Sequence, residues 1–114
     1  MNRAQQFWNE QGEWSQKTFG LDSERGPAGP LDHLEKEAKE AYYEVVSGDY
    51  LDEPEKLDTE IADCLFLVFD AARRSGMTLD GLLDTAFRKL EVNKQRKWQT
   101  PTPGVELAIE HVRD

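Results

Sequence analysis

The sequence lacks the features that would place the protein in or across a membrane. No apolar stretch reaches the roughly twenty residues that span a bilayer. The amino-terminal residues, among them Arg3 and Gln5, do not form the apolar core of a signal peptide. The single cysteine, Cys64, can form no intramolecular disulfide, which is typical of a reducing compartment. We therefore expect a soluble, cytoplasmic protein in which Cys64 is a small core residue.

Basic residues are also scarce. The 114 residues include 14 lysines and arginines against 23 aspartates and glutamates, which gives a formal net charge of −9. Such a surface does not suit a nucleic acid polymer, whose phosphate backbone is bound by basic side chains. An anionic ligand would need a metal ion or a local basic cluster. A chain of this length is expected to form one domain with a small core, so self-association is a reasonable expectation.

The motifs of several common enzyme classes are missing. The sequence contains no G-x-x-x-x-G-K-[ST] phosphate loop. The Glu-x-x-His repeats of di-metal redox bundles are absent as well. His33 and His111 are the only two histidines, too few and too peripheral to indicate a nucleophile and base pair. These absences argue against a P-loop nucleotidase, a di-iron protein and a serine or cysteine hydrolase.

The chain does have two acidic pairs at helical spacing, Glu37-x-x-Glu40 and Glu60-x-x-Asp63. Residues three apart lie on one face of a helix, so each pair projects two carboxylates in nearly the same direction. Two such helices packed together would form the oxygen-ligand box that Mg²⁺ or Mn²⁺ prefers. The alternative is that the pairs are solvated or bound to lysine and arginine. The spacing alone leaves both interpretations open.

The pattern of apolar residues predicts an all-α bundle of four helices without strands. Glycines and prolines predict a loop over residues 19–30, after which Asp32 is the expected cap of the second helix. Thr78 is the expected cap of the fourth helix. The expected helices cover residues 2–17, 32–46, 54–75 and 79–97. Residues 1–98 would thus form the domain, and residues 99–114 a short tail that is extended or briefly helical.

The third expected helix carries the most apolar run of the chain, residues 65–69. Its apolar residues recur at intervals of three and four, which predicts a core stripe. The stripe consists of Leu57, Ile61, Leu65, Val68 and Ala72. Such a helix is expected to lie at the centre of a bundle or between subunits.

The fourth expected helix carries a basic counterpart to the carboxylates. Lys89, Asn93 and Arg96 fall on one face of an ideal helix. That face could hold phosphate oxygens, with arginine as a fork and lysine as a point charge. Cations at a helix C-terminus also complement the helix dipole, but Asn93 contributes nothing to that role. We therefore favour phosphate binding.

Five segments between Trp14 and Trp98 follow one another in an order that is known from one family. They are Trp14-Ser-Gln-Lys-Thr-Phe-Gly20, Gly29-Pro-Leu-Asp-His-Leu-Glu-Lys-Glu37-Ala-Lys-Glu40, Glu60-Ile-Ala-Asp63, Asp70-Ala-Ala-Arg-Arg-Ser-Gly76 and Lys89-Leu-Glu-Val-Asn93-Lys-Gln-Arg96-Lys-Trp98. With them the chain resembles the MazG-type all-α nucleotide pyrophosphohydrolases. It is most similar to the dATP/dGTP diphosphohydrolase branch, sometimes called MazZ-like, which bacteria and their phages often carry. The resemblance extends from about Phe7 to the end of the chain.

The resemblance implies hydrolysis of a nucleoside triphosphate to its monophosphate and pyrophosphate by a dimer or a dimer of dimers. It implies that the two acidic pairs, Glu37, Glu40, Glu60 and Asp63, are the catalytic residues that hold Mg²⁺, for which Mn²⁺ would substitute. Lys89, Asn93 and Arg96 would contact the phosphates, and a purine deoxynucleoside triphosphate is the implied substrate. Many relatives have a further acid where this chain has Lys36, so the resemblance does not identify the general base.

Two further questions stay open at this point. Trp14, Phe19 and His33 lie in or beside the first loop and could contact a purine base. Core packing is the favoured role for Trp14, and a surface or capping role is the favoured one for His33. The function also has an alternative, since a non-catalytic acidic helical module could use its apolar third helix to bind a protein partner.

Overall fold

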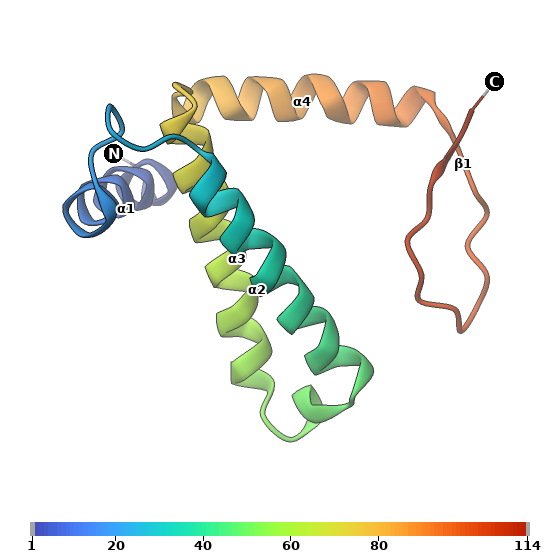
Figure 1. The fold of residues 1–114 in the computed structure, drawn as a ribbon. Coiled ribbons are helices and arrows are strands. Elements are labelled where there is room, and N and C mark those ends of the chain that lie inside the picture. The colour runs from blue at the N-terminus through green and yellow to red at the C-terminus, as the bar shows by residue number, and fades with distance from the viewer. Residues whose placement is uncertain (1, 114) are drawn as a thin grey trace. The chain divides into compact units, whose positions relative to one another are not determined.

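The computed structural model describes residues 2–113 and confirms an all-α fold (Figure 1). The helices are α1 (Arg3–Phe19), α2 (Ala28–Val46), α3 (Pro54–Arg74) and α4 (Leu79–Gln95), with a short 3₁₀ turn, η1 (Asp49–Leu51), between α2 and α3. Two minimal strands, β1 (Lys97–Trp98) and β2 (His111–Val112), follow. No helix within residues 2–113 is both long and apolar enough to cross a membrane. The chain divides into two compact units, Met1–Asp80 and Gly81–Asp114. The domain boundary expected at residue 98 stays a prediction.

Helices α2 and α3 form an antiparallel hairpin in the first unit (Figure 1). Helix α3 begins at Pro54, as predicted, because a proline fits the first helical turn, where its missing N–H would have no intrahelical partner. It ends before Gly76, whose φ of 96° is a conformation that glycine adopts readily. The hairpin therefore places residues 28–46 directly beside residues 54–74.

Helix α1 packs on α3 through aromatic side chains. The rings of Trp8 and Phe69 lie 5.2 Å apart, and those of Phe7 and Phe69 lie 5.7 Å apart. Trp8 retains 7% exposure and Leu67 6%, which places them in the small apolar core. These contacts hold the first half of α1 against the C-terminal half of α3.

Helix α2 begins earlier than predicted. Its first residue is Ala28, so Gly29 and Pro30 lie in the first turn rather than in a loop. Asp32 is not the cap, and its carboxylate pairs with Lys36 at 3.7 Å instead. The prediction was wrong because a proline in the first turn of a helix removes no hydrogen bond. The earlier start adds one turn of helix beside the end of α1.

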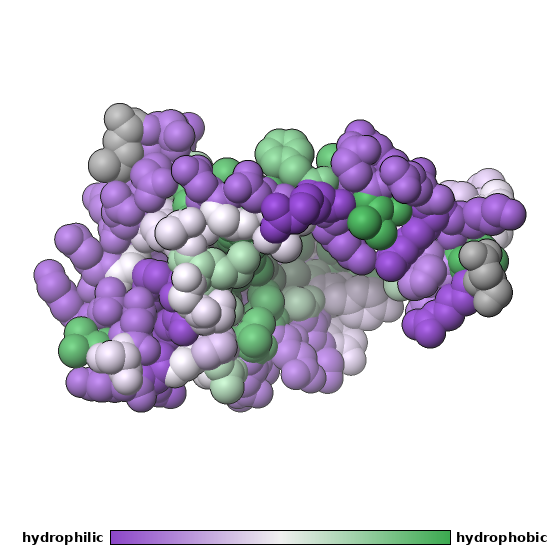
Figure 2. Space-filling view, turned by 90° about the horizontal axis from the view of Figure 1, so that it is seen from above, coloured by the Kyte–Doolittle hydropathy of each residue, from purple (hydrophilic) through white to green (hydrophobic). Residues whose placement is uncertain are grey.

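The predicted core stripe of α3 is also wrong for the single chain. Ile61 is 56% exposed, Leu65 50% and Val68 38%, and only Ala72 at the end of the stripe is buried. Figure 2 shows apolar side chains at the surface among hydrophilic ones. The face of α3 that meets α2 instead carries polar residues, namely Lys56, Glu60 and Asp63, together with Leu67.

The second unit consists of most of α4 and the β1–β2 pair. Helix α4 begins directly after Thr78, as predicted, but most of its apolar residues are exposed, including Leu83 (44%) and Leu90 (46%). The tail is extended: Lys97 pairs with Val112 and Trp98 with His111 in an antiparallel ladder. The Trp98 Nε1 donates a hydrogen bond of 2.7 Å to the Asn93 carbonyl, which ties this ladder to the end of α4.

Candidate active site

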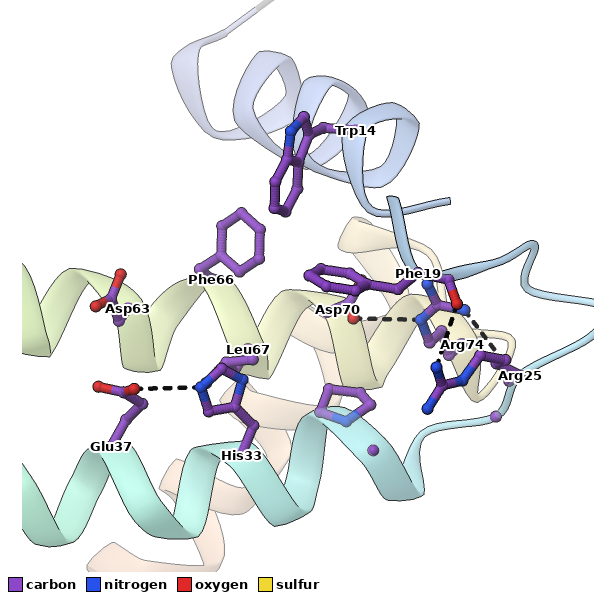
Figure 3. A pocket seen from close by; sticks show the side chains of 13 residues that line it. Trp14, Phe19, Arg25, His33, Glu37, Asp63, Phe66, Leu67, Asp70 and Arg74 are labelled. Atoms are coloured by element: carbon purple, nitrogen blue, oxygen red, sulfur yellow. Dashed lines mark hydrogen bonds and ion pairs between the residues drawn. The ribbon is translucent and has the colours of Figure 1, made fainter. Parts of the chain in front are cut away.

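The two predicted acidic pairs face each other across the α2–α3 hairpin. Glu37 and Asp63 line the same cavity from opposite helices (Figure 3). Burial raises the pKa of Glu60, and the negative charges of Glu44, Glu40 and Glu37 raise it further, while Lys56 opposes them. Glu37, Glu40, Glu60 and Asp63 lie on the facing sides of α2 and α3, and we call these four residues the acidic cluster. Their roles as catalytic residues and metal ligands stay predictions.

The cluster has unsatisfied acceptors that suit a cation. Among the described residues, the Oε2 atoms of Glu44 and Glu60 are buried and have no hydrogen-bond partner. Buried carboxylate oxygens without a donor are costly unless a cation or a proton meets them. No three histidine, cysteine or acidic side chains within residues 2–113 form a group that could hold a metal ion as they lie. The donor set thus fits a hard divalent ion, but binding one requires the flexible glutamate side chains to turn toward it.

A cavity of about 430 Å³ lies beside the cluster (Figure 3). One wall is aromatic, since Trp14 makes edge contacts with Phe19 at 5.3 Å and with Phe66 at 5.5 Å between ring centroids. The other wall carries Glu37 and Asp63. Pockets of this size, largely apolar and with a few polar groups, are typical of small-molecule sites.

All three residues that could contact a base, Trp14, Phe19 and His33, line this cavity. Trp14 is 51% exposed, so the favoured prediction that it packs in the core is wrong for the single chain. The His33 Nε2 lies 3.2 Å from the Glu37 Oε1, which joins His33 to the acidic cluster. Contact of Trp14 or His33 with a substrate stays a prediction.

The end of the cavity near Phe19 is held by a buried ionic network that the sequence analysis did not identify. The Asp70 carboxylate receives hydrogen bonds from Arg73 at 2.6 Å and Arg74 at 3.2 Å. Burial would raise the pKa of Asp70, but hydrogen bonds from Ser15, Gln11 and the two arginines outweigh it and lower the pKa. The signal was present in the sequence, because Arg73 and Arg74 follow Asp70 at the helical spacings of three and four.

Arg74 connects this network to the loop after α1. Its side chain is only 2% exposed. It donates to the carbonyl oxygens of Gly20 at 3.0 Å and Arg25 at 3.2 Å and to the Ser15 hydroxyl at 3.0 Å. The loop that carries Arg25 and Gly26 to the cavity is therefore anchored on α3.

Glu44 is a further acid that the sequence analysis missed. It lies two helical turns after Glu37, on the same face of α2. Only 8% of its surface is exposed, and its Oε1 accepts from the Lys56 Nζ at 2.9 Å. The seven-residue spacing from Glu37 could have identified it, but burial of an acid is not evident from a sequence.

The predicted phosphate-binding residues belong to the second unit. Lys89 and Asn93 lie on α4, and Arg96 follows its end with its N–H donating to the Asn93 carbonyl at 3.3 Å. Arg96 also lines a cavity of about 410 Å³ with Lys97, His111 and Arg113. The role of Lys89, Asn93 and Arg96 toward a substrate stays a prediction.

These features define an all-α protein with a cluster of facing carboxylates beside an aromatic cavity. The chain belongs to the dATP/dGTP pyrophosphohydrolase family, whose sequence model matches residues 7–114. It is also 43% identical over 95 residues to the Eaa protein of Salmonella phage P22, an alignment that covers 83% of this chain and 26% of the relative. The chain thus spans about a quarter of the length of that protein. No solved structure matches the chain.

Proposed function

We propose that the protein hydrolyses purine deoxynucleoside triphosphates, dGTP and dATP, to the monophosphate and pyrophosphate in a Mg²⁺-dependent reaction. The observation that carries the proposal is the cluster of Glu37, Glu40, Glu60 and Asp63 at the edge of an aromatic cavity. Membership of the dATP/dGTP pyrophosphohydrolase family supports the reaction and the substrate class.

The four clustered carboxylates would hold the metal. Mg²⁺ at this position would supply neutralisation of charge on the phosphate oxygens, which phosphoryl transfer requires. An acidic protein can bind an acidic substrate only through such a cation or through basic side chains. Lys89, Asn93 and Arg96 would supply the basic and amide donors to the phosphate oxygens.

The chain's own side chains would orient the reactants. Trp14 and Phe66 would stack on the purine in the cavity, where they already contact each other at 5.5 Å. Glu37 or Glu40 would accept the proton from the attacking water. His33, hydrogen-bonded to Glu37 at 3.2 Å, would fix the direction of that carboxylate.

The functional form would be a homodimer or homotetramer. Helix α3 exposes Ile61, Leu65 and Val68 along one stripe, and α4 exposes Leu83, Phe87 and Leu90 along another. Contiguous exposed apolar surface of this kind marks an interface. A second copy of the chain is the partner we propose for these stripes.

The proposal is tested by incubating the protein with each canonical NTP and dNTP and Mg²⁺, and by following pyrophosphate and monophosphate release. We expect turnover of dGTP and dATP and none after chelation. A folded protein that releases neither product from any nucleotide would leave the alternative, an acidic helical module that binds a protein partner. In that case, Glu60→Gln would change neither partner binding nor stability appreciably.

A further inference from the structure

Arg25 lies in the loop between α1 and α2 and lines the aromatic cavity. Figure 3 shows it at one end of the cavity and shows Glu37 and Asp63 at the other end. The rings of Trp14 and Phe66 lie between the two ends. A cationic and an anionic group thus occupy opposite ends of one aromatic cavity.

The surroundings of Arg25 hold its side chain in place. Its Nη1 donates a hydrogen bond of 3.3 Å to the Phe19 carbonyl. The side chain also passes close to two glycines, since a Cβ atom at Gly20 would lie 3.2 Å from the Arg25 Cδ, and one at Gly29 would lie 3.4 Å from its Nη2. The Arg25 carbonyl oxygen accepts from the buried Arg74 at 3.2 Å. The guanidinium group is therefore positioned before a ligand enters, which lowers the ordering cost of binding.

Arg25 has donors that the protein itself does not use. The ion pairs within residues 2–113 do not include Arg25, although the chain has 23 aspartates and glutamates. A guanidinium group carries five N–H donors, and the Phe19 carbonyl takes one of them. The other arginine that lines the cavity, Arg74, differs because Asp70 and backbone carbonyls bind its donors. Arg25 is therefore the cavity arginine that can donate to a ligand.

A nucleotide in the cavity would offer Arg25 the edge of its base. If the triphosphate lies at the carboxylate end and the base lies between the rings, the far edge of the base points toward Arg25. Guanine has two acceptors on one edge, O6 and N7, which arginine binds with two hydrogen bonds. Adenine has an amino group in place of O6, and a guanidinium group cannot accept from it. The geometry therefore favours guanine at this end of the cavity.

We propose that Arg25 is a specificity-determining residue that selects guanine over adenine. This inference rests on the proposed function in that it assumes that the nucleotide binds with its base in the aromatic cavity. It goes further by ranking dGTP above dATP and by assigning that preference to one side chain. A guanidinium group also binds phosphate oxygens, but a phosphate contact would be the same for both nucleotides. The ratio of dGTP to dATP turnover therefore distinguishes a base contact from a phosphate contact.

The test compares kcat/KM for dGTP with kcat/KM for dATP in the full chain with Mg²⁺. We expect the unmodified protein to favour dGTP, and the ratio of the two values to fall on the order of tenfold in Arg25→Gln. Arg25→Lys keeps the charge but loses the planar fork, so the ratio should fall there as well. Arg3→Gln is the matched control, because it removes an equal charge from an exposed residue outside the cavity and should keep the ratio of the unmodified protein.

Binding of dGMP and dAMP, measured by isothermal titration calorimetry, makes the test independent of hydrolysis. We expect the unmodified protein to bind dGMP more tightly than dAMP, and Arg25→Gln to bind the two with nearly equal affinity.

The outcomes separate this inference from the proposed function. Turnover with a ratio that Arg25→Gln leaves unchanged, or an unmodified protein that favours dATP, would overturn the inference while the proposed function stands. Guanine-selective binding that depends on Arg25, without turnover of any nucleotide, would overturn the proposed function alone. A folded protein that neither binds nor hydrolyses purine nucleotides would overturn both.

Discussion

At the scale of single residues, Asp70 joins the elements that surround the cavity. Its carboxylate is 5% exposed and joins Arg73 and Arg74 on α3 to Gln11 on α1. When one partner of a buried ion pair is removed, the other charge stays buried without compensation. The free-energy cost of that removal exceeds the net stabilisation that the intact pair provides. Asp70 is thus a structural acid, although it lies on the same line of α3 as Glu60 and Asp63.

We predict that Asp70→Asn lowers the free energy of unfolding by about 3 kcal/mol at pH 7, as measured by urea denaturation. The pKa of Asp70 is lowered in the folded state, so its stabilisation is present above the unfolded-state pKa and is lost as the pH falls through the folded-state pKa. The difference between the variant and the unmodified protein should therefore shrink in acid. A difference that stays constant down to the lowest accessible pH would contradict this account.

Trp14 is the residue at which base binding is tested most simply. We predict that Trp14→Ala raises KM for dGTP on the order of tenfold or more, because stacking on an aromatic ring contributes about 1–3 kcal/mol per base. The kcat should change little, since the ring lies on the wall opposite the carboxylates. Trp14→Phe retains a ring and should recover most of the affinity. Equal KM values in all three proteins would remove Trp14 from the substrate site.

At the scale of elements, the close approach of α1 to α3 depends on Gly12. A Cβ atom at this position would lie 3.0 Å from the Arg73 Cδ. Arg73 cannot easily move away, because Asp22, Gln11 and Asp70 all bind its guanidinium group. The helix–helix contact and the ionic network therefore constrain each other.

We predict that Gly12→Ala destabilises the protein, although alanine in a helix normally gains up to about 1 kcal/mol over glycine. Thermal unfolding measures the effect, with a lower midpoint as the expected result. Glu13→Ala is the control, since Glu13 is exposed on the same helix and its replacement should leave the midpoint nearly unchanged. A higher midpoint for Gly12→Ala would show that Arg73 yields without cost.

The sequence predicted where the helices begin and end better than it predicted which of their side chains are buried. The start of α3 at Pro54 and its end before Gly76 followed from local chemistry. The start of α2 did not, because Pro30 is as compatible with a first helical turn as with a loop. The acidic pairs lie on helices, as their spacing predicted, and their roles stay predictions. The buried state of Glu44 depends on packing between α2 and α3. Tertiary partners, such as those of Arg74, cannot be read from spacing alone.

At the scale of the whole molecule, helix α3 exposes apolar surface. Ile61, Leu65 and Val68 recur at helical spacing, yet each is at least 38% exposed. The apolar residues do recur with the period of a helix, as predicted, but they are exposed in the single chain. We propose that the stripe is buried in an assembly, which would suit a chain of 114 residues with a small core.

We predict that Leu65→Asp reduces the mass of the particle to that of one chain, because a buried, unpaired carboxylate at an interface is strongly unfavourable. Light scattering after size exclusion measures the mass. Leu51→Asp is the control, since Leu51 is 73% exposed and lies outside the stripe, so the assembly should persist. An unmodified protein that is already a monomer would contradict the proposed assembly.

The central claim is that the acidic cluster of α2 and α3 carries metal-dependent nucleotide hydrolysis. The most direct measurement is pyrophosphate release from dGTP and Mg²⁺ by the unmodified protein and by Asp63→Asn, with folding of both checked by circular dichroism. We predict turnover by the unmodified protein and a loss of at least about a hundredfold in kcat for the variant. Removing one group that stabilises the transition state typically lowers kcat to about this extent. Equal turnover by both folded proteins would contradict the claim.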